Sequence, residues 1–157
     1  MLESSRAATV ADLPELVRLS AEGRADIHEA RGGRLWLIRE APPEPLDQVF
    51  ALGIESPMWL VQLALIDHVP LGFLLAEVDD RGGQVLAVAR ELYVMPEARG
   101  VGLGELLMDA TVTWATNAGC TGIDGYALPG DRATKNYFET FGLVARGIVV
   151  NRRLGSS

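Results

Sequence analysis

The chain has 157 residues, 48% of them hydrophobic and 22% charged, and its formal net charge is −7 at pH 7. This length and composition fit one ordinary globular domain over residues 1–157. The negative charge argues against a nucleic-acid partner, and a single cysteine, Cys120, excludes an internal disulfide. The chain has no signal-peptide pattern and no apolar run of about 18 residues, so we expect a cytoplasmic protein that does not enter a membrane.

The N-terminal part predicts an edge strand or a tail, followed by a helix. Residues 1–8 form that strand or tail. Asp12 is placed to cap a helix that runs to about residue 30, and Glu15, three residues later, completes a capping box. The glycine pair that begins at Gly32 ends this helix.

Residues 34–56 have the least regular pattern of the chain. The apolar residues 35–38 fit either a strand or part of a helix, and both alternatives stay open. Three prolines within residues 42–45 require a turn or linker, because proline does not fit a helix interior. Residues 46–52 show weak helical spacing.

The middle of the chain predicts a β-meander. Apolar runs at residues 59–66, 71–78 and 84–94 are typical of strands. Turn-forming residues at 67–70 and 79–83 separate them, so the three runs form two successive hairpins.

The rest of the chain alternates between helix and strand. The pattern predicts helices over residues 103–117 and 131–140, and strands over residues 123–128 and 144–150. Asp131 is placed to cap the second helix. A meander followed by this tail predicts an α/β (α+β) fold, with a mixed, mostly antiparallel central sheet and helices on both faces.

A glycine-rich turn joins the last meander strand to the helix that follows it. Residues 92–104 read Leu-Tyr-Val-Met-Pro-Glu-Ala-Arg-Gly-Val-Gly-Leu-Gly. Such a turn leaves backbone N–H groups free at a helix N-terminus, where the helix dipole is positive, and glycine lets an anion approach closely. Arg99 adds a positive charge. The turn therefore predicts a phosphate-binding site.

The spacing of the glycines narrows the choice of phosphate ligand. A Walker loop is excluded because Gly104 is followed by Glu105 instead of lysine. The sequence G-x-G-x-G is one residue short of the dinucleotide fingerprint, although Asp124 lies about twenty residues further on, where the ribose-binding acid would stand. Only about fifty residues follow the turn, too few for the rest of a doubly wound sheet.

The remaining pattern is R-x-x-G-x-G, formed by Arg99, Gly102 and Gly104 after a strand. It resembles the pyrophosphate loop of the GNAT superfamily of acyl-CoA-dependent N-acetyltransferases. The order of predicted elements over roughly residues 6–151 is also similar to that of this superfamily. The resemblance implies a GNAT-like acyl-CoA N-acyltransferase fold.

A second motif extends the resemblance. Residues 127–143 are similar to the family pattern N-x-x-A-x-x-[LF]-Y-x-x-x-G-[FL], with two departures. Asp131 stands where the family usually has Asn, and Phe138 stands where it usually has the Tyr that protonates the leaving CoA thiolate in many members. Phe138 has no proton to donate. A thiolate can also leave unassisted or take a proton from water, so catalysis is not excluded.

The resemblance implies which residues bind the CoA part of the substrate. The strand before the loop supplies backbone N–H groups to the pantetheine arm and to the thioester carbonyl, and the loop holds the pyrophosphate. The implied residues are Leu92, Tyr93, Val94, Arg99, Gly100, Val101, Gly102, Leu103, Gly104 and Glu105, together with Asp131 and Phe138 in the second motif.

Two residues are candidates for catalysis. Glu91 lies in the strand before the loop, and strand alternation places it on the same face as Tyr93, so it is the carboxylate best placed to accept a proton from an amine. Tyr137 precedes Phe138 and lies about 100° from it around a helix. Carboxylates in strands are more often solvated or salt-bridged than catalytic, so Glu91 also fits that role, and Tyr137 also fits core packing. Further candidates, each compatible with ordinary surface, are Glu77, Asp124, Tyr126, His28 and His68.

The resemblance implies an acyltransferase: an acetyl-CoA-dependent N-acetyltransferase in which an amine attacks directly in a ternary complex. The expected acceptor is an amine of a small molecule or of a protein, the expected co-substrate is acetyl-CoA, no metal is required, and the family pattern makes a homodimer a reasonable expectation. The alternative, motivated by Phe138, is a non-catalytic acyl-CoA-binding or sensing module.

Overall fold

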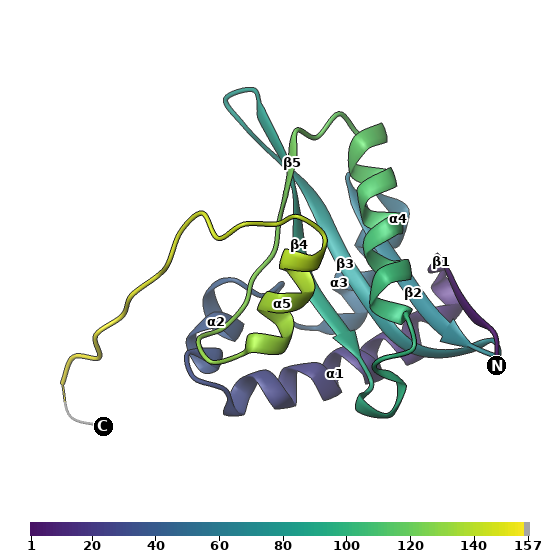
Figure 1. Cartoon of the computed structure of the whole chain (residues 1–157), viewed down its shortest axis with the longest axis horizontal. Coiled ribbons are helices and arrows are strands. Elements are labelled where there is room, and N and C mark those ends of the chain that lie inside the picture. Colours follow the sequence, from purple (N-terminus) through teal and green to yellow (C-terminus); the bar gives the residue numbers. More distant parts are fainter. Residues whose placement is uncertain (156–157) are drawn as a thin grey trace.

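The computed structural model describes residues 1–155, in which helices flank a five-stranded sheet with the strand order β1-β2-β3-β4-β5 (Figure 1). The strands are β1 (Glu3–Ala7), β2 (Trp59–Ile66), β3 (Val69–Arg81), β4 (Gln84–Val94) and β5 (Gly122–Asp124). The α-helices are α1 (Leu13–Glu29), α2 (Gly33–Arg39), α3 (Leu46–Glu55), α4 (Leu103–Asn117) and α5 (Arg132–Thr140), and short 3-10 helices are η1 (Val10–Asp12) and η2 (Pro96–Ala98).

The strand directions confirm a mixed, mostly antiparallel sheet. The first four strands are antiparallel to their neighbours, and β5 alone runs parallel to β4. The hairpin between β3 and β4 is tighter than the sequence predicts, because β3 continues through Arg81 and only Gly82 and Gly83 form the turn. Both glycines have positive φ, as a two-residue turn with the twist of the sheet requires.

Helices cover both faces of the sheet, as the sequence predicts (Figure 1). Alternation along β3 sends Phe73 and Leu75 into a core shared with α1 and α3, and sends Leu74 and Ala76 into a second core against α4. The apolar segment at residues 35–38 belongs to a helix, α2. Among residues 1–155 we find no helix long and apolar enough to cross a membrane.

The start of α1 is held by residues other than those that the sequence predicts. Asp12 is the N-cap residue, but its side chain makes no capping bond to α1, so the predicted box with Glu15 is wrong. The capping box instead joins Thr9 and Asp12 one turn earlier, in η1. Asp12 also accepts two bonds from Arg6, at 2.7 and 2.9 Å, because β1 brings that guanidinium alongside. The Asp12 carboxylate is therefore bound by Arg6 and by the backbone N–H of Thr9, and it does not cap α1.

The bidentate pair with Arg6 lowers the pKa of Asp12 to about 2. A folded-state pKa below the usual carboxylate value stabilises the fold above about pH 4, and this contribution is lost as pH falls toward about 2. We expect Asp12→Asn to lower the free energy of unfolding at pH 7 by about 1–2 kcal/mol, a range that allows for the exposure of Arg6. The free energies of unfolding of the two proteins, measured by urea titration, should become equal near pH 2. A difference that stays constant with pH would contradict the prediction.

Two of the predicted C-terminal strands differ from the structure. The strand expected over residues 123–128 is reduced to β5, because β4 pairs with it only as far as Asp124. The strand expected over residues 144–150 is absent; these residues have no regular structure and are exposed. A strand needs a neighbour for its backbone hydrogen bonds. Within residues 1–155, this segment has no such neighbour, so that prediction is wrong for the single chain.

Candidate functional site

A partly enclosed hollow opens where β4 and β5 diverge. These strands pair only from Leu86 to Val88 of β4. Just beyond, the register shifts: Ala89 and Glu91 pair with successive residues of β3, so Arg90 forms a bulge. Bulges bend a strand and often lie next to active sites. The gap that results is a cavity of about 530 Å³, lined by β4, α1, α2, α5 and the glycine-rich turn.

Glycine is required in the turn for two different reasons. Gly100 and Gly102 have φ of +85° and +90°, a backbone conformation that other residues adopt only under strain. Gly104 has ordinary φ but no room, since a Cβ there would lie 2.8 Å from the ring of Tyr137. Gly102 is the N-cap residue of α4. The turn therefore bends tightly onto α4 and lets α5 pack against the first turn of that helix.

The turn also leaves a row of backbone donors free. Within residues 1–155, the N–H groups of residues 100–105 donate to no protein acceptor. These groups surround the N-terminus of α4 and border the cavity. Free N–H groups at the positive end of a helix dipole form an anion site. The residues present therefore fit a phosphate group of the kind that CoA carries.

Arg99 lies beside this row of donors. Its Nε donates to the carbonyl oxygen of Val94 at 2.8 Å, and its guanidinium lies 5.8 Å from the centre of the Tyr93 ring. Within the described residues, Arg99 has no salt bridge to a carboxylate. Its charge is thus held at the mouth of the cavity, next to the predicted phosphate position.

We expect Arg99→Ala to weaken acetyl-CoA binding by about 1–3 kcal/mol, the value of lost hydrogen bonds to a charged group. Arg81→Ala is the matched control, because Arg81 is an exposed arginine at the end of β3 that pairs with Asp79. Calorimetry measures the acetyl-CoA affinity of both variants. Equal affinity of Arg99→Ala and the unaltered protein would make Arg99 an ordinary surface charge.

The end of β4 presents backbone to the cavity and side chains to the two cores. Leu92 and Val94 pack toward α4, and Tyr93 packs toward α1. Gly23 of α1 makes room for the Tyr93 ring, since a Cβ there would lie 3.1 Å from that ring. The Tyr93 hydroxyl donates to Glu22 at 3.3 Å, and burial raises the pKa of Tyr93. A glycine inside a predicted helix was the sequence signal for this close approach.

Glu91 is buried at the inner end of the cavity, on the Tyr93 side of β4 as alternation predicts. One carboxylate oxygen accepts from the hydroxyl of Ser20 at 2.7 Å, and the other forms an ion pair with Arg24. Arg24 also donates to the carbonyl oxygen of Pro42 at 2.8 Å. Sequence reasoning missed Ser20 and Arg24, because nothing in the spacing of α1 says which of its polar residues faces β4.

Two buried donors in this part of the cavity have no acceptor within residues 1–155. They are Nε of Arg24 and Nε1 of Trp36. Trp36, from α2, lies with its ring edge-to-face against Tyr126 at a centroid distance of 5.8 Å. Buried donors are nearly always paired. This pair of groups is therefore suited to a ligand that brings oxygen acceptors.

The second motif places the rings of Tyr137 and Phe138 edge-to-face on α5, with their centroids 5.3 Å apart. The Tyr137 hydroxyl donates to the carbonyl oxygen of Gly104 at 2.6 Å, and burial, with smaller contributions from Asp109 and Glu105, raises the pKa of Tyr137. Phe138 is buried, and its ring fills the space that a Cβ on Gly125 would need.

Asp131 caps α5, as the sequence predicts, by accepting from the backbone N–H of Thr134 at 3.1 Å. It also borders the cavity. Four of the other polar candidates have protein partners, whereas His68 lies in the turn between β2 and β3. Glu77 and Tyr126 contact Arg90, Asp124 contacts Arg146, and His28 contacts Glu29.

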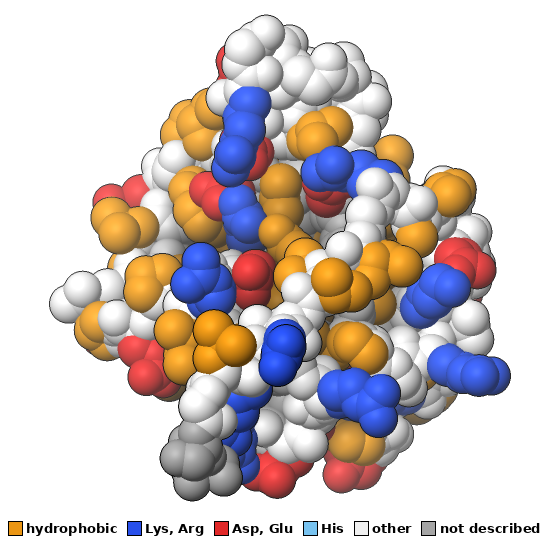
Figure 2. All heavy atoms as spheres, turned by 90° about the vertical axis from the view of Figure 1, so that its left-hand side faces the viewer, with side chains coloured by type: hydrophobic (Ala, Val, Ile, Leu, Met, Phe, Trp, Pro, Cys, Tyr) orange, Lys and Arg blue, Asp and Glu red, His pale blue; other side chains and the backbone are white. Residues whose placement is uncertain are grey.

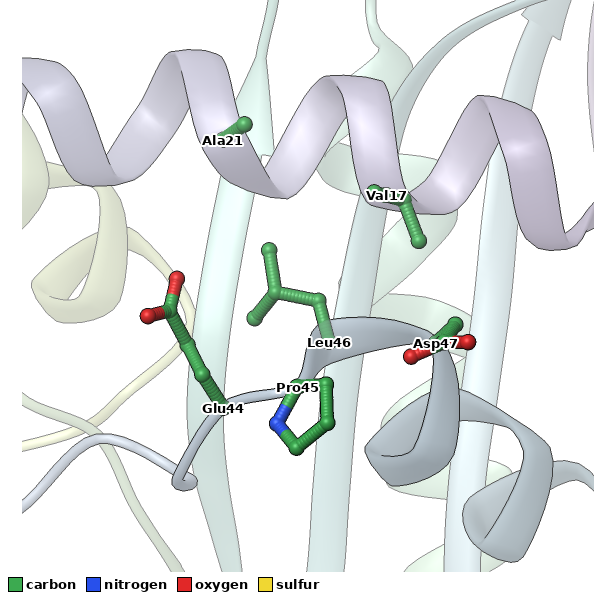
Figure 3. A pocket seen from close by; sticks show the side chains of 6 residues that line it. All are labelled: Val17, Ala21, Glu44, Pro45, Leu46 and Asp47. Atoms are coloured by element: carbon green, nitrogen blue, oxygen red, sulfur yellow. The ribbon is translucent and has the colours of Figure 1, made fainter.

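A second, more open hollow lies between α1 and the loop before α3 (Figure 3). Val17 and Ala21 of α1 face Leu46 across it, and the carboxylates of Glu44 and Asp47 stand at its two sides. Its lining holds these two carboxylates and no basic residue, and neither of the buried unpaired side-chain donors of the described chain lies there. We therefore assign the functional site to the cavity beside β4.

Comparisons with known proteins identify the family. The sequence profile described as the Acetyltransferase (GNAT) family matches residues 26–143, which include β4, the turn and α5. The chain belongs to the GNAT family. GNAT membership makes it an acyltransferase at the general level. No curated protein matches the sequence closely enough to count as a relative.

Solved structures with the same fold include other GNAT proteins. AAC(6')-Iy, solved in complex with the bisubstrate analogue CoA-S-monomethyl-acetylneamine, is 17% identical with a TM-score of 0.75, over 99% of this chain and 100% of that chain. A ribosomal-protein-alanine N-acetyltransferase from Brucella melitensis is 16% identical with a TM-score of 0.67, over 98% and 100%. A tetramutant of the BH1408 protein from Bacillus halodurans is 16% identical with a TM-score of 0.80, over 96% and 99%. At these identities the likeness establishes the fold alone.

Proposed function

We propose that this GNAT protein is an N-acetyltransferase that moves an acetyl group from acetyl-CoA to an amine by direct attack, with both substrates bound together. One observation carries the proposal: the free N–H groups of residues 100–105 and the unpaired edge of β4 open onto the same cavity. The first group suits a pyrophosphate. The second suits a chain of amide groups such as the pantetheine arm, which can pair with the edge of a strand.

In this proposal the backbone of Leu92, Tyr93 and Val94 binds the pantetheine arm and donates to the thioester carbonyl. Acetyl-CoA, when bound, supplies the thioester carbon that the amine attacks. Fixed N–H donors stabilise the negative charge that develops on a carbonyl oxygen, because they need no rearrangement during the reaction. Holding both substrates in one cavity adds the benefit of proximity.

The inner end of the cavity is where we place the acceptor amine. The buried carboxylate of Glu91 and the exposed carboxylate of Asp26 both line the cavity, which favours a cationic amine in a protein of net charge −7. The unpaired donors of Arg24 and Trp36 favour an acceptor that also carries hydroxyl or carbonyl oxygens. We propose Glu91 as the group that accepts the proton of the amine. Small-molecule amines and protein amines both meet these requirements.

Calorimetry with acetyl-CoA, followed by a thiol-release assay against a panel of amines in the same sample, tests the proposal. We expect binding of one acetyl-CoA per chain and release of CoA with at least one polyhydroxylated amine or peptide. Absence of binding would overturn the assignment of the turn to pyrophosphate. Dephospho-CoA and NAD, run as competitors, report whether the site prefers CoA to a dinucleotide.

A second candidate function is a non-catalytic acyl-CoA-binding or sensing module. Two contacts favour it: Phe138 is packed against Gly125 and has no proton to give, and both oxygens of Glu91 already have protein partners. Binding of acetyl-CoA without turnover on any amine would support this candidate over the first.

Tyr137 is a catalytic candidate from the sequence, and its contacts allow a direct test of that role. Its hydroxyl is committed to Gly104, and a phenol of raised pKa is a weak acid. We therefore expect Tyr137→Phe to reduce acetyl-CoA affinity and thermal stability modestly, by about 1 kcal/mol each, the value of one hydrogen bond, with kcat unchanged. Tyr126→Phe, which removes another hydroxyl of the cavity, is the control. A fall of about a hundredfold in kcat with loss of the alkaline limb would instead establish Tyr137 as the proton donor.

A further inference from the structure

Helix α2 and the turn before it carry arginines that form no ion pair. Half of the 14 lysine and arginine side chains form a salt bridge with a carboxylate in residues 1–155. Three of the others lie close together in the sequence and are exposed: Arg31, Arg34 and Arg39. The nearby carboxylate of Glu29 contacts His28 instead. Positive charge without a partner, in a protein of net charge −7, indicates that this place binds an acidic ligand.

The same side of α2 is also apolar. Ile38 is 79% exposed and Leu35 is 46% exposed. Residues three and four positions apart are neighbours on a helix, so Ile38 lies beside Arg34 and Leu35, and Arg39 lies beside Leu35. We call these four side chains, together with Arg31, the α2 face. Figure 2 views the molecule from the side on which α2 lies in Figure 1, and hydrophobic and basic side chains are interspersed there. Arginine among exposed apolar groups is typical of a surface that binds another protein.

The α2 face adjoins the cavity beside β4. Trp36 lies two residues from both Arg34 and Ile38, and thus on the other side of the helix, where it is buried and lines the cavity. The turn before α2 packs near the cavity wall, since a Cβ on Gly32 would lie 4.0 Å from Leu128. A helix is about 10–12 Å thick, a distance that about three or four residues of an extended chain span. One extended chain is therefore able to occupy the cavity and the α2 face together.

We propose that the α2 face binds an acidic segment of a protein acceptor whose amine enters the cavity. This inference rests on the proposed N-acetyltransferase function and narrows its acceptor to an amine of an acidic peptide. Carboxylates of the peptide pair with Arg31, Arg34 and Arg39, and its apolar side chains cover Leu35 and Ile38. These carboxylates begin about three or four residues from the amine, because that length of chain passes around α2.

The cavity favours a peptide over other anionic partners. Within the described residues, the buried Nε1 of Trp36 and Nε of Arg24 have no acceptor, and a peptide backbone brings carbonyl oxygens that pair with such donors. A nucleic acid or an anionic membrane presents a large negative surface, which a body of net charge −7 repels. A peptide is small enough to contact the α2 face alone, where the charge is positive.

Fluorescence polarisation with a labelled peptide tests the surface without catalysis. The probe begins with an alanine that has a free amine, continues with alternating glutamate and leucine, and carries the dye at its C-terminus. We expect Arg34→Glu/Arg39→Glu to bind this probe at least about tenfold more weakly than the unaltered protein does. The matched control is Arg152→Glu/Arg153→Glu, which changes the net charge equally at two exposed arginines that form no salt bridge in residues 1–155. Its affinity should be unchanged.

Three results would overturn the proposal. They are no binding of the probe by the unaltered protein, equal weakening in both double variants, and equal binding of a probe with lysine in place of glutamate. Vesicles of phosphatidylglycerol and phosphatidylcholine test the membrane alternative. Co-sedimentation with these vesicles that Arg34→Glu/Arg39→Glu abolishes, in a protein that does not bind the peptide, would assign the α2 face to a lipid surface.

Kinetics connect the α2 face with the cavity. With acetyl-CoA present, we expect Arg34→Glu/Arg39→Glu to raise KM for the acidic peptide at least about tenfold. Its kcat, and its KM for a small amine without carboxylates, should be unchanged. The two proposals fail separately. A protein that turns over small amines but does not bind the peptide would overturn only the role of the α2 face, whereas a protein that binds the peptide but no acetyl-CoA would overturn only the acetyltransferase.

Discussion

Gly102→Val should bind acetyl-CoA roughly a hundredfold more weakly, a loss of about 2.7 kcal/mol in binding free energy. We expect the protein to stay folded. Gly102 has a φ of +90°, which a β-branched residue does not adopt without strain. The turn would relieve that strain by moving, and the N–H groups of residues 100–105 would move with it. Nothing lies within 4 Å of a Cβ at this position, so the loss would come from the backbone and not from a clash with the protein.

Gly83→Val is the matched control for this experiment. Gly83 has a φ of +85° and equally open surroundings, but it lies in the hairpin between β3 and β4. Both variants should lose stability by a similar amount, on the order of 1–3 kcal/mol. Only Gly102→Val should lose acetyl-CoA affinity, measured by calorimetry. Unchanged affinity in Gly102→Val would remove the turn from the binding site.

Glu91→Ala should destabilise the protein by about 3–5 kcal/mol, because it leaves the Arg24 guanidinium buried without its counter-charge. Both side chains are almost wholly buried, with exposures of 6% for Glu91 and 11% for Arg24. Denaturant titration measures the loss. A loss under about 1 kcal/mol, the value of an exposed salt bridge, would mean that solvent reaches the pair.

Glu91→Gln separates the structural role of this residue from a chemical one. Glutamine keeps an oxygen and an amide near Ser20 and Arg24 but accepts no proton at neutral pH. If Glu91 is the proton acceptor, kcat/KM should fall about a hundredfold at pH 7 and recover as pH rises toward the pKa of the amine itself. Glu77→Gln is the control, since Glu77 is the acidic partner of Arg90 on β3. A loss that is equal at all pH values would make Glu91 a positioning residue.

Local patterns determined most of the fold and the phosphate-binding half of the candidate site. The meander strands, the helix after the glycine-rich turn and the cap at Asp131 depend on neighbours within a few residues, so spacing alone predicted them. The turn is a local structure as well. Positive φ at Gly100 and Gly102 and the free N–H groups at the start of α4 follow from one short stretch of sequence.

Contacts between distant segments decided the rest. Arg24 and Ser20 of α1 contact Glu91 of β4 only because α1 packs on that face of the sheet. In the same way, Asp12 binds Arg6 of β1 instead of making the predicted capping bond to α1. The strand expected over residues 144–150 shows the same principle. Alternation determines that a segment is able to form a strand, but a neighbouring strand edge must be available to pair with it, and that is a property of the folded or assembled molecule.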